Sequence, residues 1–295
     1  MPLKATNKRE QVSPTCIILT LRPKAARSVE CEDPYGEVWG RGTWSVEVKQ
    51  PELQIARAYT PLPPGVGGGG LGSDLRFLIR REERGEVSRY LHSLQEGAQV
   101  DLRGPKVEVE LPAEVSDVVF LAGGTGIAPA LQVVYTLLEK RKGGGDRDRL
   151  PKIRIVWANR KREDCVGGYG GDHNPPTGTG NGNAALGYIV RELQSLQEKY
   201  PDSLQVQYVV DEEGTMLDQK RIPPLLNTPQ SDAKTVKYSP VTTRIDSKLL
   251  FVSGPEGFVD YLAGPKKWEG GKEGQGELGG VLRRMGIRDW KVWKL

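Results

Sequence analysis

The feature that most constrains the fold is a change of hydrophobic rhythm near residue 112. Before it, apolar and charged residues alternate with a period of two, as in residues 75–80 and 107–111. Such alternation is typical of strands with one buried face. A helical pattern over residues 86–95 interrupts these strands. We therefore expect an antiparallel β-barrel over residues 14–113, preceded by a flexible segment, residues 1–13.

After residue 113, four short apolar runs rich in β-branched residues alternate with helical patterns. The runs cover residues 117–122, 153–158, 204–210 and 248–253. Strands that alternate with helices in this way are typical of βαβ units and a parallel sheet. We expect an α/β doubly wound domain over residues 114–295, to which residues 290–295 can add a last strand. Two stretches rich in Gly, Pro and polar residues, 166–184 and 222–246, are expected to be surface loops.

Composition excludes several classes of protein. The 42 Lys and Arg residues exceed the 38 Asp and Glu residues by only 4, too few to indicate a nucleic-acid-binding protein. Three cysteines and two histidines show no metal-ligand spacing and cannot form a disulfide framework. The chain has no apolar run of about 18 residues that could span a membrane. Its first residues show neither a secretory signal nor a convincing transit peptide.

A Gly-rich turn carries the strongest local signal. Residues 121–129 read L-A-G-G-T-G-I-A-P, and they follow one predicted strand and open a predicted helix. Glycines there let a ligand approach the backbone closely, and the helix N-terminus favours a pyrophosphate. The alternative is an ordinary strand-to-helix turn that binds nothing.

Three further motifs are weak when taken singly. Arg57 and Tyr59 end a strand, where Arg can pair with a phosphate and Tyr offers an aromatic face. A surface ion pair and a core tyrosine are the alternatives. Gly85 and Ser88 open the barrel helix, as a simple cap or as a second phosphate site. The Ser253-Gly254-Pro255 turn follows the fourth strand of the predicted sheet, where ligands of open α/β sheets bind but where a turn can also simply end the strand.

In this order and spacing, R-x-Y-T-P, G-x-V-S, GGTGIAP and SGPEGF resemble the motifs of the ferredoxin-reductase-type flavoproteins, above all the cytochrome b5 reductase branch. The resemblance covers roughly residues 14–260. It implies an FAD-binding barrel, an NAD(P)-binding domain and a flavin at their junction. It also implies an enzyme in which NADH, or NADPH, gives a hydride to FAD, which then passes single electrons to a ferric haem or haem protein.

The resemblance also implies roles for individual residues. Arg57 binds the FAD phosphate, and Tyr59 and Thr60 contact the flavin and its ribityl chain. The remaining FAD contacts implied are Pro61, Gly85, Val87 and Ser88. The turn Gly123, Gly124, Thr125 and Gly126 approaches the NAD(P)H pyrophosphate, and Thr125 and Pro129 shape the nicotinamide side together with the turn at Gly254 and Pro255.

Two positions bear on rate and specificity. The family usually carries a Cys against the nicotinamide where this chain has Ser253, a difference that bears on the rate of hydride transfer more than on the type of reaction. The resemblance implies Tyr59, Thr60 and Ser253 as the catalytic positions. Asp211 follows the third strand of the predicted sheet. If Asp211 lies near the adenosine ribose, it repels a 2′-phosphate and favours NADH; the alternative is a solvated strand end.

A narrower resemblance involves residues 54–64 and the terminal W-K-V-W-K-L. Both are similar to fungal mitochondrial flavoproteins needed for cytochrome c import and haem attachment. This implies a mitochondrial location, on the intermembrane-space side of the inner membrane, with a membrane anchor only outside this chain. The implied partner is cytochrome c or its attachment machinery. A general NADH–cytochrome b5 reductase and a flavin-binding assembly factor without turnover are the alternatives.

Basic residues cluster over residues 140–162 and 283–294. They can form a docking surface for an acidic partner or haem propionates, because complementary charge steers encounter. The alternative is an ordinary solvated surface.

Overall fold

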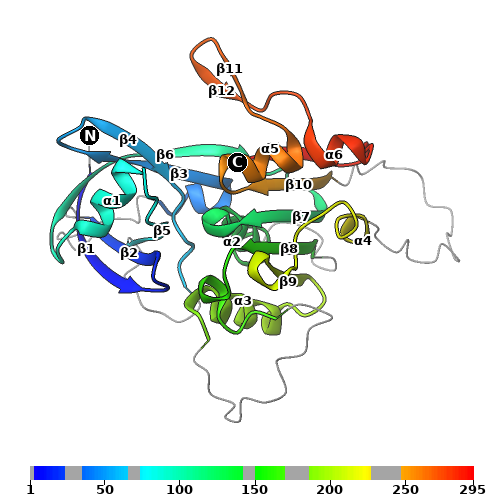
Figure 1. Cartoon of the computed structure of the whole chain (residues 1–295), viewed down its shortest axis with the longest axis horizontal. Helices are drawn as coiled ribbons and strands as arrows, with labels where there is room; N and C mark the ends of the chain where they lie inside the picture. The colour runs from blue at the N-terminus through cyan, green and yellow to red at the C-terminus, as the bar shows by residue number, and fades with distance from the viewer. Residues whose placement is uncertain (1–2, 24–34, 66–73, 142–149, 170–185, 227–246) are drawn as a thin grey trace, which may run out of the picture.

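The computed structural model describes residues 3–23, 35–65, 74–141, 150–169, 186–226 and 247–295. These residues form two adjoining domains, with the barrel strands on the left of Figure 1 and a parallel sheet on the right. No helix in these ranges is long and apolar enough to cross a membrane.

The first domain is a six-stranded antiparallel sheet in the order β4-β3-β6-β1-β2-β5. A bridge between Leu62, just after β4, and Arg76 in β5 joins the two outer strands and so closes the barrel. Trp44 and Phe77 fill its interior, and helix α1 packs Leu91 against them. The bounds are β1 (Leu3–Gln11), β2 (Cys16–Pro23), β3 (Gly42–Gln50), β4 (Ile55–Tyr59), β5 (Leu75–Arg80), α1 (Glu86–Ser93) and β6 (Gln99–Glu110), with a 3₁₀ turn at Val38–Gly40.

The start of the chain differs from the prediction of a flexible segment over residues 1–13. Residues 3–11 form β1, which pairs antiparallel with both β2 and β6. Its sequence, LKATNKREQ, shows no apolar alternation. Backbone hydrogen bonds to two neighbouring strands hold it, and composition does not reveal such pairing.

The second domain is a five-stranded parallel sheet in the order β13-β10-β7-β8-β9, which confirms the expected doubly wound fold. Helices α2 and α3 cover one face of the sheet, and α4, α5 and α6 cover the other. The strand order reverses between β7 and β10, which is the switch point at which such sheets bind ligands. The bounds are β7 (Val115–Gly123), α2 (Ile127–Val134) with a π-helical turn (Tyr135–Lys140), β8 (Lys152–Asn159), α3 (Tyr188–Lys199), β9 (Leu204–Val210), α4 (Pro223–Leu226), β10 (Ser247–Ser253), α5 (Glu256–Ala263), α6 (Gly280–Arg284) and β13 (Lys291–Lys294).

Two of the first residues of the predicted surface loop over residues 222–246 are buried, so the prediction is wrong there. Ile222 and Leu225 are buried against the parallel sheet, and residues 223–226 form the short helix α4. The two prolines suggested a loop, but Pro is well tolerated in the first turn of a helix, so they are compatible with α4. Residues 227–246, and residues 170–184 of the other predicted loop (166–184), lie outside the described residues.

One apolar core crosses the domain boundary. Cys16, Ile18 and Leu78 of the barrel pack in the same cluster as the side chains of α2 and of the parallel sheet. A second core fills the barrel, and a third lies under α5 and α6. The shared core fixes the barrel against the sheet.

A two-stranded hairpin, β11 (Lys267–Glu269) and β12 (Lys272–Gly274), stands out from the body at the top of Figure 1. The ammonium group of Lys294, a residue that is only 3% exposed, holds its base by donating to the carbonyls of Pro265 and Glu277 at 2.8 Å each. Burial lowers the pKa of Lys294. The C-terminal strand β13 therefore anchors the hairpin.

Candidate functional site

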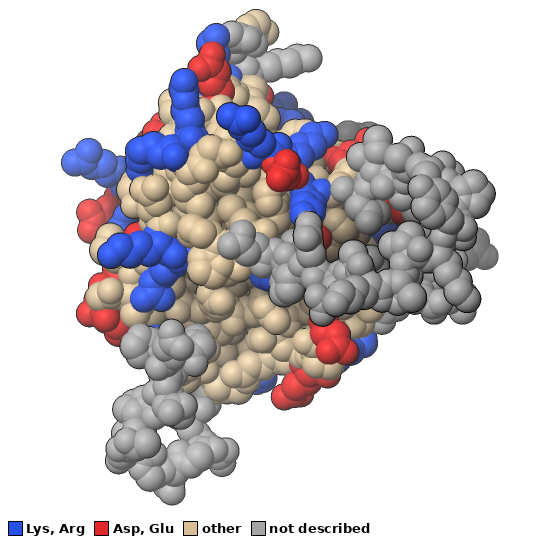
Figure 2. Space-filling model, turned by 90° about the vertical axis from the view of Figure 1, so that its right-hand side faces the viewer, with Lys and Arg blue, Asp and Glu red and all other residues tan. Residues whose placement is uncertain are grey.

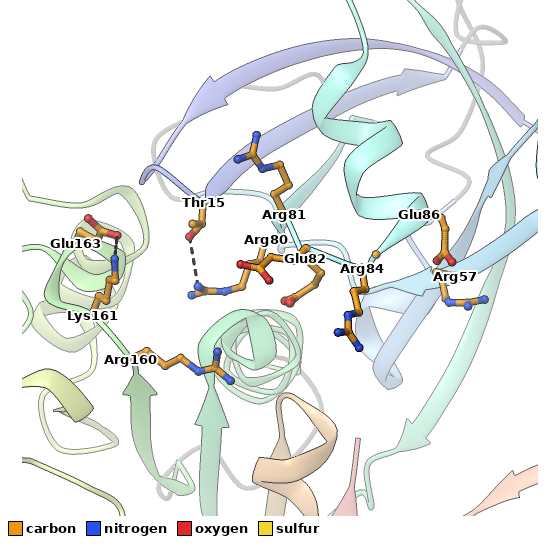
Figure 3. A pocket seen from close by; sticks show the side chains of 12 residues that line it. Thr15, Arg57, Arg80, Arg81, Glu82, Arg84, Glu86, Arg160, Lys161 and Glu163 are labelled. Carbon is orange, nitrogen blue, oxygen red and sulfur yellow. Dashed lines mark hydrogen bonds and ion pairs between the residues drawn. The ribbon is translucent and has the colours of Figure 1, made fainter.

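A cleft of about 830 Å³ lies at the junction of the two domains (Figure 3). The barrel provides one wall and the loop after β8 provides the other. Six cationic and four acidic side chains line the cleft, so the net charge of its lining favours an anionic ligand. The lining residues are Thr15, Arg57, Arg80, Arg81, Glu82, Glu83, Arg84, Gly85, Glu86, Arg160, Lys161 and Glu163.

The start of α1 opens onto this cleft. Gly85 is the residue before the helix, and the Ser88 hydroxyl donates to its carbonyl at 3.0 Å while accepting from the Glu82 amide at 3.2 Å. A Cβ on Gly85 would lie 2.5 Å from that hydroxyl oxygen, so glycine is needed for this tight turn. The side chain of Val87 is buried in the barrel core. First-turn N–H groups of a helix have no partner within the helix, so this end can receive a phosphate.

Arg57 and Tyr59 lie on β4 beside that helix start. The Arg57 guanidinium is exposed, and it donates only to the neighbouring Ala56 carbonyl, at 2.9 Å, among the described residues. Figure 3 shows it next to Glu86 at the mouth of the cleft. Burial raises the pKa of Tyr59 to about 12, opposed by the charge of Arg57. Tyr59 therefore keeps its proton at neutral pH and can donate a hydrogen bond. Thr60 is half-buried and Pro61 is buried.

The Gly-rich turn lies at the switch point of the sheet. Gly124 has a positive φ of 54°, and its carbonyl accepts a hydrogen bond of 2.8 Å from the indole of buried Trp157. A Cβ on Gly126 would lie 2.3 Å from the Ser253 carbonyl oxygen. The turns that end β7 and β10 therefore touch backbone to backbone.

Around that contact, Thr125 is half-buried and Pro129 is buried in α2. Ser253 is buried, Gly254 is half-buried, and exposed Pro255 precedes α5. The structure thus brings the Gly123–Gly126 and Ser253–Pro255 motifs together in one cluster. Of the predicted residues, Arg57 and Gly85 line the cleft itself.

A charged network that the sequence reasoning missed connects the cleft with this cluster. The Asp164 carboxylate accepts from the Ser13 hydroxyl at 2.7 Å and from the Arg80 guanidinium at 2.6 Å, which joins the two domains. Arg80 also donates to Thr15 at 3.3 Å, and its guanidinium lies about 3.8 Å from where a Cβ on Gly124 would be. The sequence did contain a signal for this pair, because Arg80 is the last residue of one predicted strand and Asp164 follows another.

Asp211 lies in the turn after β9 and is exposed. The Arg162 guanidinium pairs with Glu213, and the Arg162 amide donates to the Glu212 carboxylate at 2.6 Å, so the turns after β8 and β9 are tied together. The Asp211 carboxylate makes no ion pair with any residue in the described ranges. It is therefore available to a ligand at this edge of the sheet.

These features fit FAD and a nicotinamide dinucleotide. A helix start beside an exposed Arg suits the pyrophosphate of FAD, and the half-buried Gly124 and Thr125 of the switch-point turn leave backbone accessible to a second pyrophosphate. The Gly-rich turn lies at the carboxyl ends of β7 and β10, and the helix start lines the same cleft as Arg160 and Lys161 after β8, so the two cofactors would meet at the domain junction.

Comparisons with known proteins agree with this fit. Residues 42–111 match the family model "Oxidoreductase FAD-binding domain", and residues 120–167 match "Oxidoreductase NAD-binding domain". NADH-cytochrome b5 reductase 2 of Kluyveromyces lactis is 26% identical over 242 residues, covering 81% of this chain and 67% of that protein. The same-named protein of Neurospora crassa is 26% identical over 255 residues, 82% of this chain and 59% of its own length. This chain thus spans about three-fifths to two-thirds of the length of these relatives.

An uncharacterized FAD-binding protein of Schizosaccharomyces pombe is 28% identical over 251 residues, 85% of this chain and 70% of that protein. Among solved structures, the cytochrome b5 reductase domain of Ulva prolifera nitrate reductase has a TM-score of 0.61 at 17% identity. That match covers 99% of this chain and 97% of the other, and it supports the two-domain fold described above. The chain thus carries a ferredoxin-reductase-type FAD-binding barrel followed by an NAD-binding parallel sheet, the two domains of flavin- and nicotinamide-dependent oxidoreductases.

Proposed function

We propose that this chain passes electrons from NADH, through bound FAD, to a ferric haem or haem protein. The observation that carries the proposal is the junction of the domains. Arg57 and the open start of α1 lie on one side of its cleft, and Arg80 links the cleft to the Gly-rich turn on the other.

The residues of the chain have distinct parts in this reaction. Arg57 and the first turn of α1 bind the FAD pyrophosphate, and protonated Tyr59 donates a hydrogen bond within the flavin site. Gly123–Gly126 admit the pyrophosphate of NADH, and Ser253 lies at the edge where the nicotinamide is received. Arg80, held by Asp164, keeps the barrel wall against the turn and limits water between them. When bound, FAD takes a hydride from NADH and can release electrons singly, so it supplies the redox chemistry.

For the acceptor, we propose a haem protein, and more narrowly cytochrome c or its haem-attachment machinery in mitochondria, on the intermembrane-space side of the inner membrane. Relatives at 26% identity are named NADH-cytochrome b5 reductase 2, which supports a haem-protein acceptor in general. The narrower proposal depends on residues 54–64 and the terminal W-K-V-W-K-L. Lys and Arg side chains gather on the upper part of the face in Figure 2, where they would steer an acidic partner.

A second candidate function is a flavin-binding assembly factor for cytochrome c that does not turn over. Ser253 favours it, because the residue is buried at the end of β10 and lacks the polarizable sulfur that the resemblance leads us to expect there. The intact Gly-rich turn favours the enzyme instead.

The visible spectrum of the purified protein, before and after anaerobic addition of NADH, separates these functions. A flavin spectrum that bleaches supports the oxidoreductase. One that persists with both NADH and NADPH supports the assembly factor, and absence of flavin after incubation with FAD overturns both. Stopped-flow reoxidation by cytochrome b5, cytochrome c and free haemin then identifies the acceptor. A preference for cytochrome b5 would contradict the narrower proposal.

Arg57→Ala is expected to raise the dissociation constant of FAD by about 10- to 100-fold, since a charge-assisted hydrogen bond is worth roughly 1.5–3 kcal/mol. The stability of the variant should change little, because within the described part of the chain the Arg57 guanidinium donates only to the Ala56 carbonyl. Fluorescence titration of the apoprotein with FAD measures the effect. Arg103→Ala, an exposed arginine on β6 paired with Glu47, is the matched control. Equal FAD affinity in the two variants would remove Arg57 from the site.

Asp211→Ser is expected to reduce the preference for NADH over NADPH by about tenfold, because it removes a carboxylate that repels the 2′-phosphate. The ratio of kcat/KM for the two nucleotides is the measurement. Asp202→Ser is the control, since Asp202 is also exposed but precedes β9, at the opposite end of the strand. An unchanged ratio in Asp211→Ser would mean that this carboxylate lies away from the ribose.

A further inference from the structure

Gln132 is a fully buried polar side chain between the two domains. It lies on α2 and is 0% exposed. Its Oε1 accepts from the Trp44 amide at 2.8 Å, while its Nε2 donates to the Trp44 carbonyl at 3.1 Å and to the Pro61 carbonyl at 2.9 Å. The carboxamide is thus fully used in holding barrel backbone to a helix of the other domain.

The path of β4 explains why a side chain is needed there. Strands β3 and β4 pair from Gln50 and Ile55 as far as Val46 and Tyr59, and then the chain leaves the sheet. A further strand partner could not come from Pro61, which has no N–H to donate. Gln132 replaces that partner by bonding both the N–H and the C=O of Trp44, and it ties the departing strand through the Pro61 carbonyl.

This position connects the two cofactor motifs through one rigid element. Pro61 directly follows Tyr59 and Thr60, the predicted flavin contacts. Gln132 lies six residues after Gly126, about 9 Å along a helix that begins at the Gly-rich turn. A helix keeps its length, so the Gln132 hydrogen bonds set the separation between the flavin-contacting segment and the turn that receives NADH.

We propose that Gln132 is a positioning residue for hydride transfer, an inference that rests on the function proposed above. In this role Gln132 contacts neither FAD nor NADH itself. It fixes the register between the two cofactor sites, and displacement of reacting groups by about 1 Å can cost about 100-fold in rate.

The next turn of the same helix provides a matched control. Thr136 is also 0% exposed, and its hydroxyl donates to the Trp39 carbonyl of the barrel at 2.9 Å. That carbonyl belongs to the 3₁₀ turn at Val38–Gly40, outside every cofactor motif. Thr136→Val therefore removes a buried hydrogen bond between the domains without touching the link to Pro61.

The experiment compares Gln132→Met with Thr136→Val, with Gln132→Asn as a milder variant should the methionine variant not fold. Both main variants should melt a few degrees below the parent. In the apoprotein, hydrogen exchange of the Trp44 amide should accelerate only in the Gln132 variants. With FAD saturating, flavin reduction by NADH should slow about tenfold or more in Gln132→Met, mainly in kcat with KM little changed, and stay within about twofold in Thr136→Val.

Equal slowing in the two variants would overturn the positioning role, since it would trace to stability alone. Slowing that disappears once FAD is saturating would also overturn it, because Gln132 would then act on FAD affinity. A parent protein that binds no FAD would instead overturn the proposed function. Hydrogen exchange of the Trp44 amide in the apoprotein needs no FAD, so it distinguishes failure of the proposed function from failure of the positioning role.

Discussion

Replacing Gly126 with alanine is expected to lower the free energy of unfolding by about 3 kcal/mol and to abolish reduction of bound flavin by NADH. The new Cβ would lie 2.3 Å from the carbonyl oxygen and 2.6 Å from the carbonyl carbon of Ser253, and both are backbone atoms at the end of β10. Backbone cannot rotate away as a flexible side chain can, so the turn must separate from β10. Overpacking in tight sites costs about 1–3 kcal/mol and occasionally more, and this contact is at the severe end.

Urea denaturation and stopped-flow reduction measure the two effects of Gly126→Ala. Gly257→Ala is the matched control, because a Cβ on Gly257 in α5 would meet no atom of the residues that the structure describes within 4 Å. It should leave reduction unchanged and preserve or slightly raise stability, since Ala is the better helix former. If the two variants were equally stable, the close approach of the β7 and β10 turns would be disproved.

Asp164→Ala is expected to cost about 2–3 kcal/mol and to weaken FAD binding. Its carboxylate is the shared acceptor for Ser13 and Arg80, and its side chain is only 4% exposed against 23% for Arg80. Removing one partner of a buried ion pair costs about 3–5 kcal/mol. We expect less because water reaches part of Arg80. The guanidinium would then lose its anchor across the domain boundary and move into the cleft.

The neighbouring residue offers a sharp control for that experiment. Glu163 pairs with Lys161 at 3.4 Å on the cleft wall, where the Lys161 side chain is 59% exposed and the Glu163 side chain 37%. Exposed pairs contribute about 0–1 kcal/mol, so Glu163→Ala should change stability by less than about 1 kcal/mol. The measurement is the urea midpoint of unfolding for Asp164→Ala and for Glu163→Ala. Similar midpoints would mean that the Ser13–Asp164–Arg80 network does not hold the domains together.

The parts of this fold that could be predicted from sequence are those encoded locally. The period of two in residues 75–80 and the apolar runs of the parallel sheet report burial of a strand face, and they gave the right elements. The Gly-rich turn was recognisable because its glycines, strand and helix are adjacent in the chain. Strand β1 was not predictable, since its polar sequence is held by backbone pairing with β2 and β6.

The parts that could not be predicted depend on contacts between distant segments. Ser13 and Asp164 are 151 residues apart, and Trp44 and Gln132 are 88 apart. A glutamine inside an apolar helix pattern gives no sign of which backbone groups it satisfies. Strand β4 ends at Tyr59 and so leaves Trp44 without a strand partner on that side, a geometry that exists only in the folded molecule.

The core that crosses the domain boundary affects how such a chain can diverge. Because Cys16, Ile18 and Leu78 of the barrel pack among side chains of the parallel sheet, each half buries apolar side chains against the other. A half taken from a distant relative would bring side-chain volumes that do not match, and close-packed interiors tolerate such changes poorly. Substitutions on one side therefore favour compensating substitutions on the other, so the two halves evolve as a matched pair and not as interchangeable modules.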